Sequence, residues 1–157
     1  MKTQRASISV QLDCRVPCSK FNTARFRRLA QEVCRRFGAV PARVSVSIVD
    51  DGQIQLLHKQ FFHTAKTTDV ISFDLTDEAD SIRDFDIIIN IDQARRQAQQ
   101  RNHSTEAELS LYLVHGLLHQ LGFDDLHPDQ ARRMHQEEDR ILQDAGYGKV
   151  YDSPRKG

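Results

Sequence analysis

The sequence predicts a single α+β domain with one mixed sheet of about four strands covered by helices. Segments with apolar residues at every second position are interspersed with segments whose apolar residues recur every three or four positions. No repeat or Pro/Gly-rich linker divides the chain, and 157 residues is the size of one ordinary domain. The order β-α-β-α-β-β-α-α-α favours a mixed sheet covered by helices. We expect residues 1–150 to form the domain and residues 151–157 to be a disordered tail.

The first part of the chain is predicted to hold two strands and two helices. Residues 7–14 and 44–48 alternate apolar and polar side chains, which is typical of half-buried strands. Between them, residues 26–37 carry apolar side chains at helical spacing, and Gly38 suits the left-handed position that ends a helix. A second helix is expected over residues 50–61, where either of the first two residues, both Asp, can cap it.

Two further strands and a short helix are predicted in the middle of the chain. Residues 69–75 form an apolar segment of strand length. Residues 85–91 contain three consecutive isoleucines, which suits a strand that is buried on both faces. A short helix is expected to follow, through the alanines at 94 and 98.

Two longer helices complete the predicted fold. Thr105 with Glu108 matches the S/T-x-x-E capping box, which opens a strongly apolar helix over about residues 106–121. Pro128 is well placed in the first turn of the last helix, which is expected to run to Gly146.

The charge of the chain is balanced overall but unevenly distributed. Through residue 43, ten Lys and Arg residues stand against only two acidic residues. Such a basic segment fits an anionic partner such as RNA, and we take Arg25, Arg28 and Arg35 as the candidate RNA-binding residues. The alternative is a solvated helix face whose charges pair within the fold, and the sequence does not decide between them.

The remaining composition points to the cytoplasm. The N-terminus shows no apolar signal segment, and no stretch of about 18 apolar residues exists, so no membrane association is expected. The three cysteines are Cys14, Cys18 and Cys34, an odd number that argues against a disulfide framework. Without a second Cys or His pair at zinc-finger spacing, we interpret them as free thiols.

The strongest chemical signal is the pair His115 and His119 in the most apolar helix. A spacing of four residues projects both rings from one helix face, as convergent zinc ligands require. Two unpaired polar rings would be costly in such a helix, so a metal is a better explanation than two satisfied core histidines. Gly116 stands where H-E-x-x-H peptidases carry their catalytic Glu, which argues against a metalloprotease.

A third ligand is expected just beyond the helix. Gly122 allows the chain to reverse, and Asp125 can then return a carboxylate to the two histidines; His127 is the alternative ligand. Three protein ligands leave one position open, which is the arrangement of catalytic zinc sites. We therefore predict one Zn²⁺ per chain, which would lower the pKa of a bound water toward about 7.

Three blocks of sequence together resemble the YbeY family of bacterial metal-dependent endoribonucleases, over about residues 40 to 145. The stretch 113–125, LVHGLLHQLGFDD, is similar to the family signature H-G-x-L-H-x-x-G-Y-D-H. Residues 68–73, TDVISF, resemble its T-D-V-L-S-F, and the strand at 86–89 resembles its G-D-I-x-I. The resemblance implies a metal-dependent hydrolase that cleaves single-stranded RNA in ribosomal RNA maturation and ribosome quality control. It also implies contact with the ribosome or its proteins.

The departures from the family pattern identify a divergent member. The family's third His falls on Asp125, and the Arg of its N-x-x-Y-R segment falls on Phe62, which cannot contact phosphate. His63 or Lys66 could substitute for that Arg, and they are the only catalytic candidates besides the metal-bound water. These departures leave open an alternative function, an RNA-binding ribosome-maturation factor whose metal is structural and whose catalysis is slight.

Two interpretations of individual side chains also stay open at this point. Asp69 and Ser72, in the TDVISF block, are expected more as structural residues than as substrate contacts. The other histidines, His58, His103 and His135, are expected at the surface.

Overall fold

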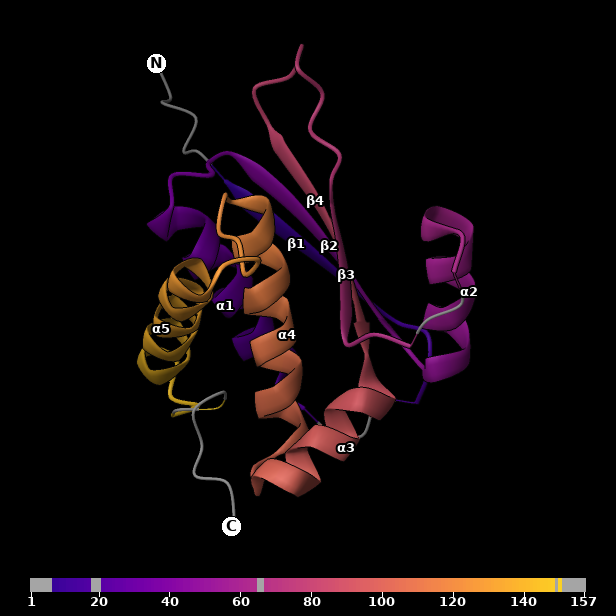
Figure 1. Cartoon of the computed structure of the whole chain (residues 1–157). Coiled ribbons are helices and arrows are strands. Elements are labelled where there is room, and N and C mark those ends of the chain that lie inside the picture. Colours follow the sequence, from indigo (N-terminus) through magenta and orange to yellow (C-terminus); the bar gives the residue numbers. More distant parts are fainter. Residues whose placement is uncertain (1–6, 18–20, 65–66, 149, 151–157) are drawn as a thin grey trace.

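The structure is a computed structural model that describes residues 7–17, 21–64, 67–148 and 150, and it confirms the α+β architecture (Figure 1). Cys18, Lys66 and the tail 151–157 lie outside the described residues. The described elements follow the predicted order: β1 (Ile8–Cys14), α1 (Thr23–Arg36), β2 (Ala42–Val49), α2 (Asp51–Phe62), β3 (Val70–Asp74), β4 (Arg83–Asn90), α3 (Ile91–Arg101), α4 (Thr105–Gln120) and α5 (Pro128–Asp144).

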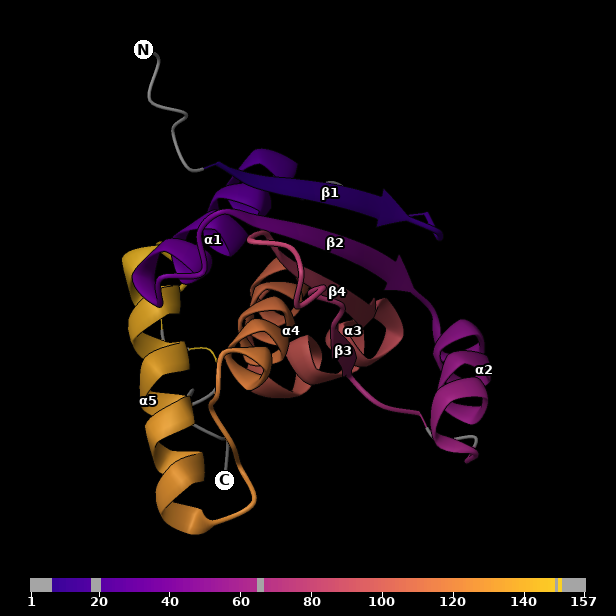
Figure 2. The same ribbon diagram turned by 90° about the horizontal axis from the view of Figure 1, so that it is seen from above.

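The four strands form one mixed sheet in the order β1-β2-β4-β3. β1 and β4 both pair with β2 in parallel, whereas β3 pairs with β4 antiparallel and lies at the edge (Figure 2). The register places Ser72 opposite Ile87 and Val70 opposite Ile89. On the central strand β4, Ile87 and Ile89 join the main core and Ile88 packs on the opposite face of the sheet. The strand is therefore buried on both faces, as its sequence predicted.

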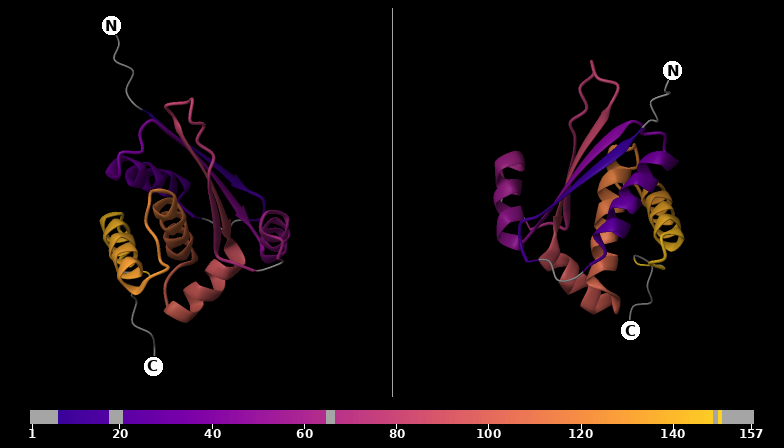
Figure 3. Two further views of the ribbon diagram at one scale, coloured as in Figure 1. Left: turned by 45° about the horizontal axis from the view of Figure 1, so that its top comes forward. Right: turned by 180° about the vertical axis from the view of Figure 1, so that it is seen from behind.

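Helices cover the two faces of the sheet unequally. α1, α4 and α5 lie on one side of the sheet (Figure 3). The main core forms there around side chains such as Phe26, Phe85 and Leu117. Of these helices of the described chain, α2 lies on the other side, where it buries Ile54 against Ile71 and Ile88. The rest of that second face carries the polar residues of β1 and β2, so α2 forms a small separate cluster beside β3 and β4.

α2 is positioned by polar contacts at its start. Asp50 caps it and forms a capping box with Gln53, which confirms the predicted aspartate cap. Asp51 accepts hydrogen bonds from the Asn90 amide at 2.7 Å and from the Arg96 guanidinium at 2.8 and 2.9 Å. The Arg96 guanidinium holds the pKa of the Asp51 carboxyl below its usual range, despite an opposing effect of burial. These contacts tie α2 to β4 and α3.

The predicted capping box at the start of α4 is wrong. Ser104 is the N-cap and accepts a hydrogen bond from the Ala107 amide at 3.1 Å. With Ser104 as N-cap, the capping-box position is Ala107, and Glu108 is one residue beyond it. Glu108 is fully buried, accepts a hydrogen bond from Arg101 at 3.0 Å and pairs with His103 at 2.7 Å. The sequence allows either Ser104 or Thr105 as the N-cap of α4. In the structure Glu108 is buried and not available for a capping box, and Ser104 is the cap.

α4 lies directly against the sheet at Gly116. A Cβ atom at this position would meet Val70 Cγ2 at 3.2 Å and Ile87 Cγ2 at 3.3 Å, which is closer than ordinary packing allows. Gly116 therefore permits the close approach that places the neighbouring histidine beside β3. In the part of the chain that the structure describes, no helix is long and apolar enough to cross a membrane.

Candidate functional site

The two histidines of α4 are each oriented by a hydrogen bond to Nδ1. His115 Nδ1 lies 2.6 Å from Glu138 Oε1, and His119 Nδ1 lies 3.0 Å from the carbonyl oxygen of Phe123. A carboxylate and a carbonyl can only accept, so both Nδ1 atoms donate and both neutral rings keep the lone pair on Nε2. The ring centroids are 5.8 Å apart. This is the arrangement that metal-binding histidines adopt.

Glu138 is the buried partner that organises this end of the site. It is completely buried on α5, and its second oxygen, Oε2, lies 3.1 Å from His135 Nδ1. Burial disfavours the charged form of His115, but the hydrogen bond and charge of Glu138, with the charges of Asp69 and Asp125, outweigh it. The pKa of His115 is therefore raised above its ordinary value. The same carboxylate would make the His115 ring a more basic metal ligand.

The predicted third ligand lies next to His115, but the three donors do not close around one point. Asp125 Oδ2 is 3.9 Å from His115 Nε2. Among residues 7–17, 21–64, 67–148 and 150, no three His, Cys, Asp or Glu side chains converge closely enough to hold an ion. The donor chemistry of His115 and His119 fits a metal, and Asp125 is the carboxylate that lies near His115 Nε2. Its role as third ligand stays a prediction.

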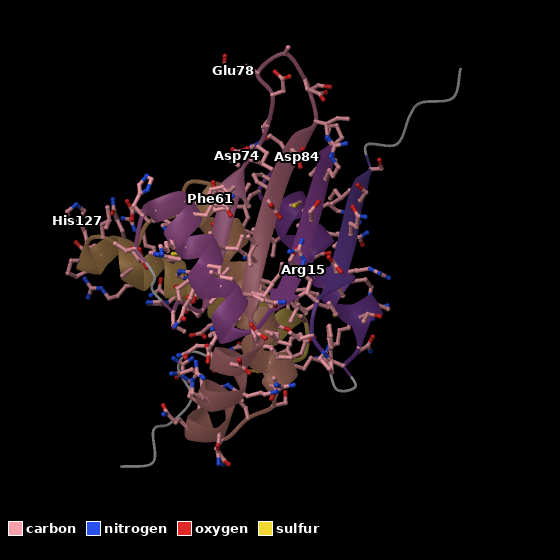
Figure 4. All side chains as sticks on the ribbon, turned by 90° about the vertical axis from the view of Figure 1, so that its right-hand side faces the viewer. Arg15, Phe61, Asp74, Glu78, Asp84 and His127 are labelled. Carbon is pink, nitrogen blue, oxygen red and sulfur yellow. The ribbon has the colours of Figure 1, made fainter. Side chains whose placement is uncertain are left out.

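The alternative ligand, His127, sits further along the chain. It is the exposed N-cap residue of α5 and makes no side-chain capping hydrogen bond. Figure 4 shows it at the outer edge of the molecule, at the start of α5. No contact links it to either histidine of α4 within the described residues, so Asp125 is the better placed of the two.

A cleft of about 430 Å³ brings the histidines together with the TDVISF block. His119 and His115 lie on one wall, and Asp69 and Ser72 lie on the other. Gln120 donates a hydrogen bond of 2.9 Å to Ser72 Oγ across the cleft. Asp69 also accepts a hydrogen bond from the Val70 amide at 2.8 Å, which is the structural role expected of it. The same side chain also lines the cleft. The remaining lining residues are His58, Phe62, Thr68, Val70, Ile71 and Gly116.

The two catalytic candidates named beside Phe62 do not join this cleft. His63 ends α2 in the left-handed region with φ 63°, is exposed, and is not among the lining residues. Lys66 lies outside the described residues. His58, His103 and His135 are partly exposed, as expected, but they are not idle surface residues, because the first lines the cleft and the other two pair with the buried glutamates.

The candidate RNA-binding arginines line a different surface. Arg25, Arg28 and Arg35 border a groove of about 700 Å³ between α1 and α5. Arg25 donates to the Ala145 carbonyl at 2.8 and 3.2 Å, and its guanidinium lies 3.7 Å from the centre of the Tyr147 ring. It therefore caps the end of α5.

Other charges of this groove also pair within the fold. Arg36 pairs with Glu137 and Asp144 of α5, at 3.4 and 3.8 Å. Arg35 pairs with Glu32 at 3.2 Å on the exposed face of α1. These pairs favour the alternative interpretation, a solvated helix face whose charges pair within the fold. RNA binding by Arg25, Arg28 and Arg35 stays a prediction.

Sequence reasoning missed Glu138 and undervalued Asp69 and Ser72. Glu138 is 23 residues from His115, and no local pattern links them. The signal in the sequence is its position: Glu138 lies on the apolar stripe of α5, with Met134 and Ile141. A glutamate is rarely buried unless it is paired, so this position indicates a partner.

The chain is similar to proteins of one known family. The family model described as Endoribonuclease YbeY matches residues 12–146. An endoribonuclease YbeY of Anaeromyxobacter sp. (strain Fw109-5) is 34% identical over 140 residues, covering 88% of this chain and 73% of the relative. One from Lysinibacillus sphaericus (strain C3-41) is 39% identical over 116 residues, covering 68% of this chain and 74% of the relative.

A solved structure extends the comparison to the fold. The solution structure of a Thermotoga maritima protein matches with a TM-score of 0.59 and 21% identity, covering 88% of this chain and 89% of that chain. At that identity the likeness concerns the fold alone. Because the family model spans nearly the whole described domain and the relatives match most of their length, the chain belongs to the YbeY endoribonuclease family.

Proposed function

We propose that the chain is a metal-dependent endoribonuclease that cleaves single-stranded RNA, and that it acts in ribosomal RNA maturation and ribosome quality control. The observation that carries the metal dependence is the matched orientation of His115 and His119, whose Nδ1 atoms are both engaged and whose Nε2 atoms are left as ligands. Family membership supports the substrate class.

The residues that would hold the metal are His115, His119 and Asp125. Two imidazoles and one carboxylate suit Zn²⁺, and we propose one ion per chain. When bound, the ion would act as a Lewis acid on a phosphoryl oxygen and make water a stronger nucleophile. Glu138 holds His115 in the right tautomer, and Asp69 adds the negative charge of the opposite wall.

The cellular setting follows from the substrate. Because ribosomal RNA is the proposed substrate, we also propose that the chain acts in the cytoplasm and contacts the ribosome or its proteins. The substrate would enter the cleft as an unpaired strand.

The alternative is an RNA-binding maturation factor with a structural metal. The favouring observation is that the described lining of the cleft contains no Lys or Arg to steady a reacting phosphate. Cleavage assays separate the two functions, whereas metal analysis alone does not.

The test is incubation of the purified chain with single-stranded ribosomal RNA, with and without chelator, beside His115→Ala. We expect cleavage that stops with chelator, returns with added zinc, and is lost in the variant. His103→Gln is the control, because His103 lies outside the cleft. Cleavage that is indifferent to both chelator and His115→Ala would refute the metal dependence, and RNA binding without any cleavage would favour the alternative.

A further inference from the structure

Four aromatic rings form a continuous cluster at the mouth of the cleft, which we call the aromatic ledge: His58, Phe61 and Phe62 of α2 with Phe73 of β3. The centroids of His58 and Phe62 are 4.8 Å apart, and those of Phe61 and Phe73 are 5.0 Å apart. Phe62 and Phe73 are nearly parallel, at 9° and 6.3 Å. Figure 4, which faces α2, shows Phe61 beside β3.

The ledge leaves large apolar surface in water. Phe61 is 49% exposed and Phe62 is 50% exposed. Burying these rings would stabilise the fold, and single exposed apolar residues are common, but a braced aromatic cluster beside a cleft is typical of a binding surface. Because the rings contact each other, little side-chain freedom remains to be lost when a ligand binds.

The ledge is continuous with the candidate site. His58 and Phe62 line the same cleft as His115 and His119. Among the described residues of that lining there is no Lys or Arg, while Asp69 contributes a negative charge. Apart from the proposed metal ion, the side chains of the lining therefore offer little attraction to phosphate, and the neutral part of a nucleotide, its base, is what the ledge can bind. A flat base stacks on aromatic rings, whatever its sequence.

We propose that Phe62, braced by Phe73 and His58, stacks one unpaired base of the RNA that enters the cleft. The proposal rests on the proposed function, since it assumes RNA as the ligand. A base inside a duplex already stacks on its neighbours and presents no free face. The ledge would therefore select single strands and fix which nucleotide lies beside the histidines.

The experiment measures equilibrium binding of the purified full-length chain to a short 2′-O-methyl oligonucleotide that resists cleavage. A series of oligonucleotides carries one abasic residue at each position in turn. We expect one position to be critical for the wild-type chain, with affinity reduced by roughly 5- to 100-fold when its base is removed. Phe62→Leu should lower affinity for the intact strand by a similar factor, and no position should then be critical.

Three controls separate stacking from other effects. Phe62→Trp should restore affinity, and the slope of log affinity against log salt should not change in Phe62→Leu, because no phosphate contact is lost. Leu56→Ala is the matched control, since Leu56 is 69% exposed on the same helix but belongs to neither ledge nor cleft. A thermal melt should show each variant folded.

The outcomes separate this proposal from the proposed function. Unchanged affinity in Phe62→Leu, an equal loss of duplex binding, or absence of binding by the wild-type chain would each overturn the stacking role. Base-dependent binding combined with no cleavage of unmodified RNA would refute the nuclease activity and leave the stacking role in place.

Discussion

The cleft around α4 and the groove between α1 and α5 differ in how their polar side chains are used. In the cleft, His115 and His119 satisfy one nitrogen each and keep the other for a ligand. In the groove, the guanidinium of Arg25 donates to the Ala145 carbonyl and lies over the Tyr147 ring. The groove is larger and more basic, but the cleft contains the histidine nitrogens that remain available to bind a ligand. Charge counted along a sequence therefore identifies a partner poorly until the internal contacts are known.

The largest effect that tests this contrast concerns the third ligand. If Asp125 binds the metal, Asp125→Ala should lower metal affinity by more than about 100-fold, which exceeds the typical effect of removing a ligand's outer hydrogen-bond partner. Asp125→His should restore a three-imidazole site. His127→Ala should leave metal content unchanged, because His127 is the exposed N-cap of α5. Metal analysis of the folded variants decides it, and loss of metal only in His127→Ala would reverse the assignment.

A smaller loss is expected when the partner of His115 is changed. Glu138→Gln keeps the shape of the buried side chain but lets an amide face Nδ1, so His115 loses its fixed tautomer. We expect metal affinity to fall about 10- to 100-fold. Glu137→Gln is the neighbouring control, since Glu137 pairs with Arg36 and Arg140 instead. Equal metal affinity in the two variants would remove Glu138 from the site.

Gly116 tests the packing that brings the cleft walls together. Gly116→Ala would press a methyl group against Val70 and Ile87, so we expect unfolding free energy to fall by about 1–2 kcal/mol. Gly52→Ala, in the first turn of α2, meets only Asp50 Oδ1 at 3.6 Å and should be neutral or stabilising. Urea denaturation of the two variants measures the difference. A stabilised Gly116→Ala variant would mean that α4 does not approach the sheet so closely.

Substitutions of the groove arginines should give the smallest effects, and these effects concern either stability or RNA affinity. Arg25→Gln should cost about 1–2 kcal/mol of stability, because it loses charged hydrogen bonds to the end of α5. Arg28→Gln should change stability by less than about 0.5 kcal/mol. If Arg28 contacts phosphate, its loss should flatten the slope of log RNA affinity against log salt by about 0.7. An unchanged slope in the triple Arg25, Arg28 and Arg35 variant would place the RNA surface elsewhere.

The sequence alone was sufficient for the order and type of the elements. Periods of two and 3.6 residues are local properties, and they identified the strands and helices of a mixed sheet. Asp50 as a cap and Pro128 in a first turn were also predictable, because capping depends on neighbouring residues. The pairing of His115 with His119 belongs to the same class, since one helical turn sets it.

Local patterns failed where two interpretations differed by one residue or one contact. The start of α4 was predicted at Thr105 with Glu108 as its capping partner, but Ser104 is the cap and Glu108 is buried. His103 and His135 are partly exposed, as predicted, but the pairing of each with a buried glutamate was not predicted. Burial depends on what packs above a residue, which its neighbours in sequence do not specify.

Only the tertiary structure decided which residues share the site. Glu138 reaches His115 across 23 residues, and Arg25 reaches Ala145 across 120. The close approach of α4 to β3 at Gly116 brings Asp69 and Ser72 to the cleft that holds the histidines, and the packing of α2 on the sheet adds Phe62. Such contacts arise when apolar faces of distant elements pack together, so their register is set by the whole core and not by any one segment.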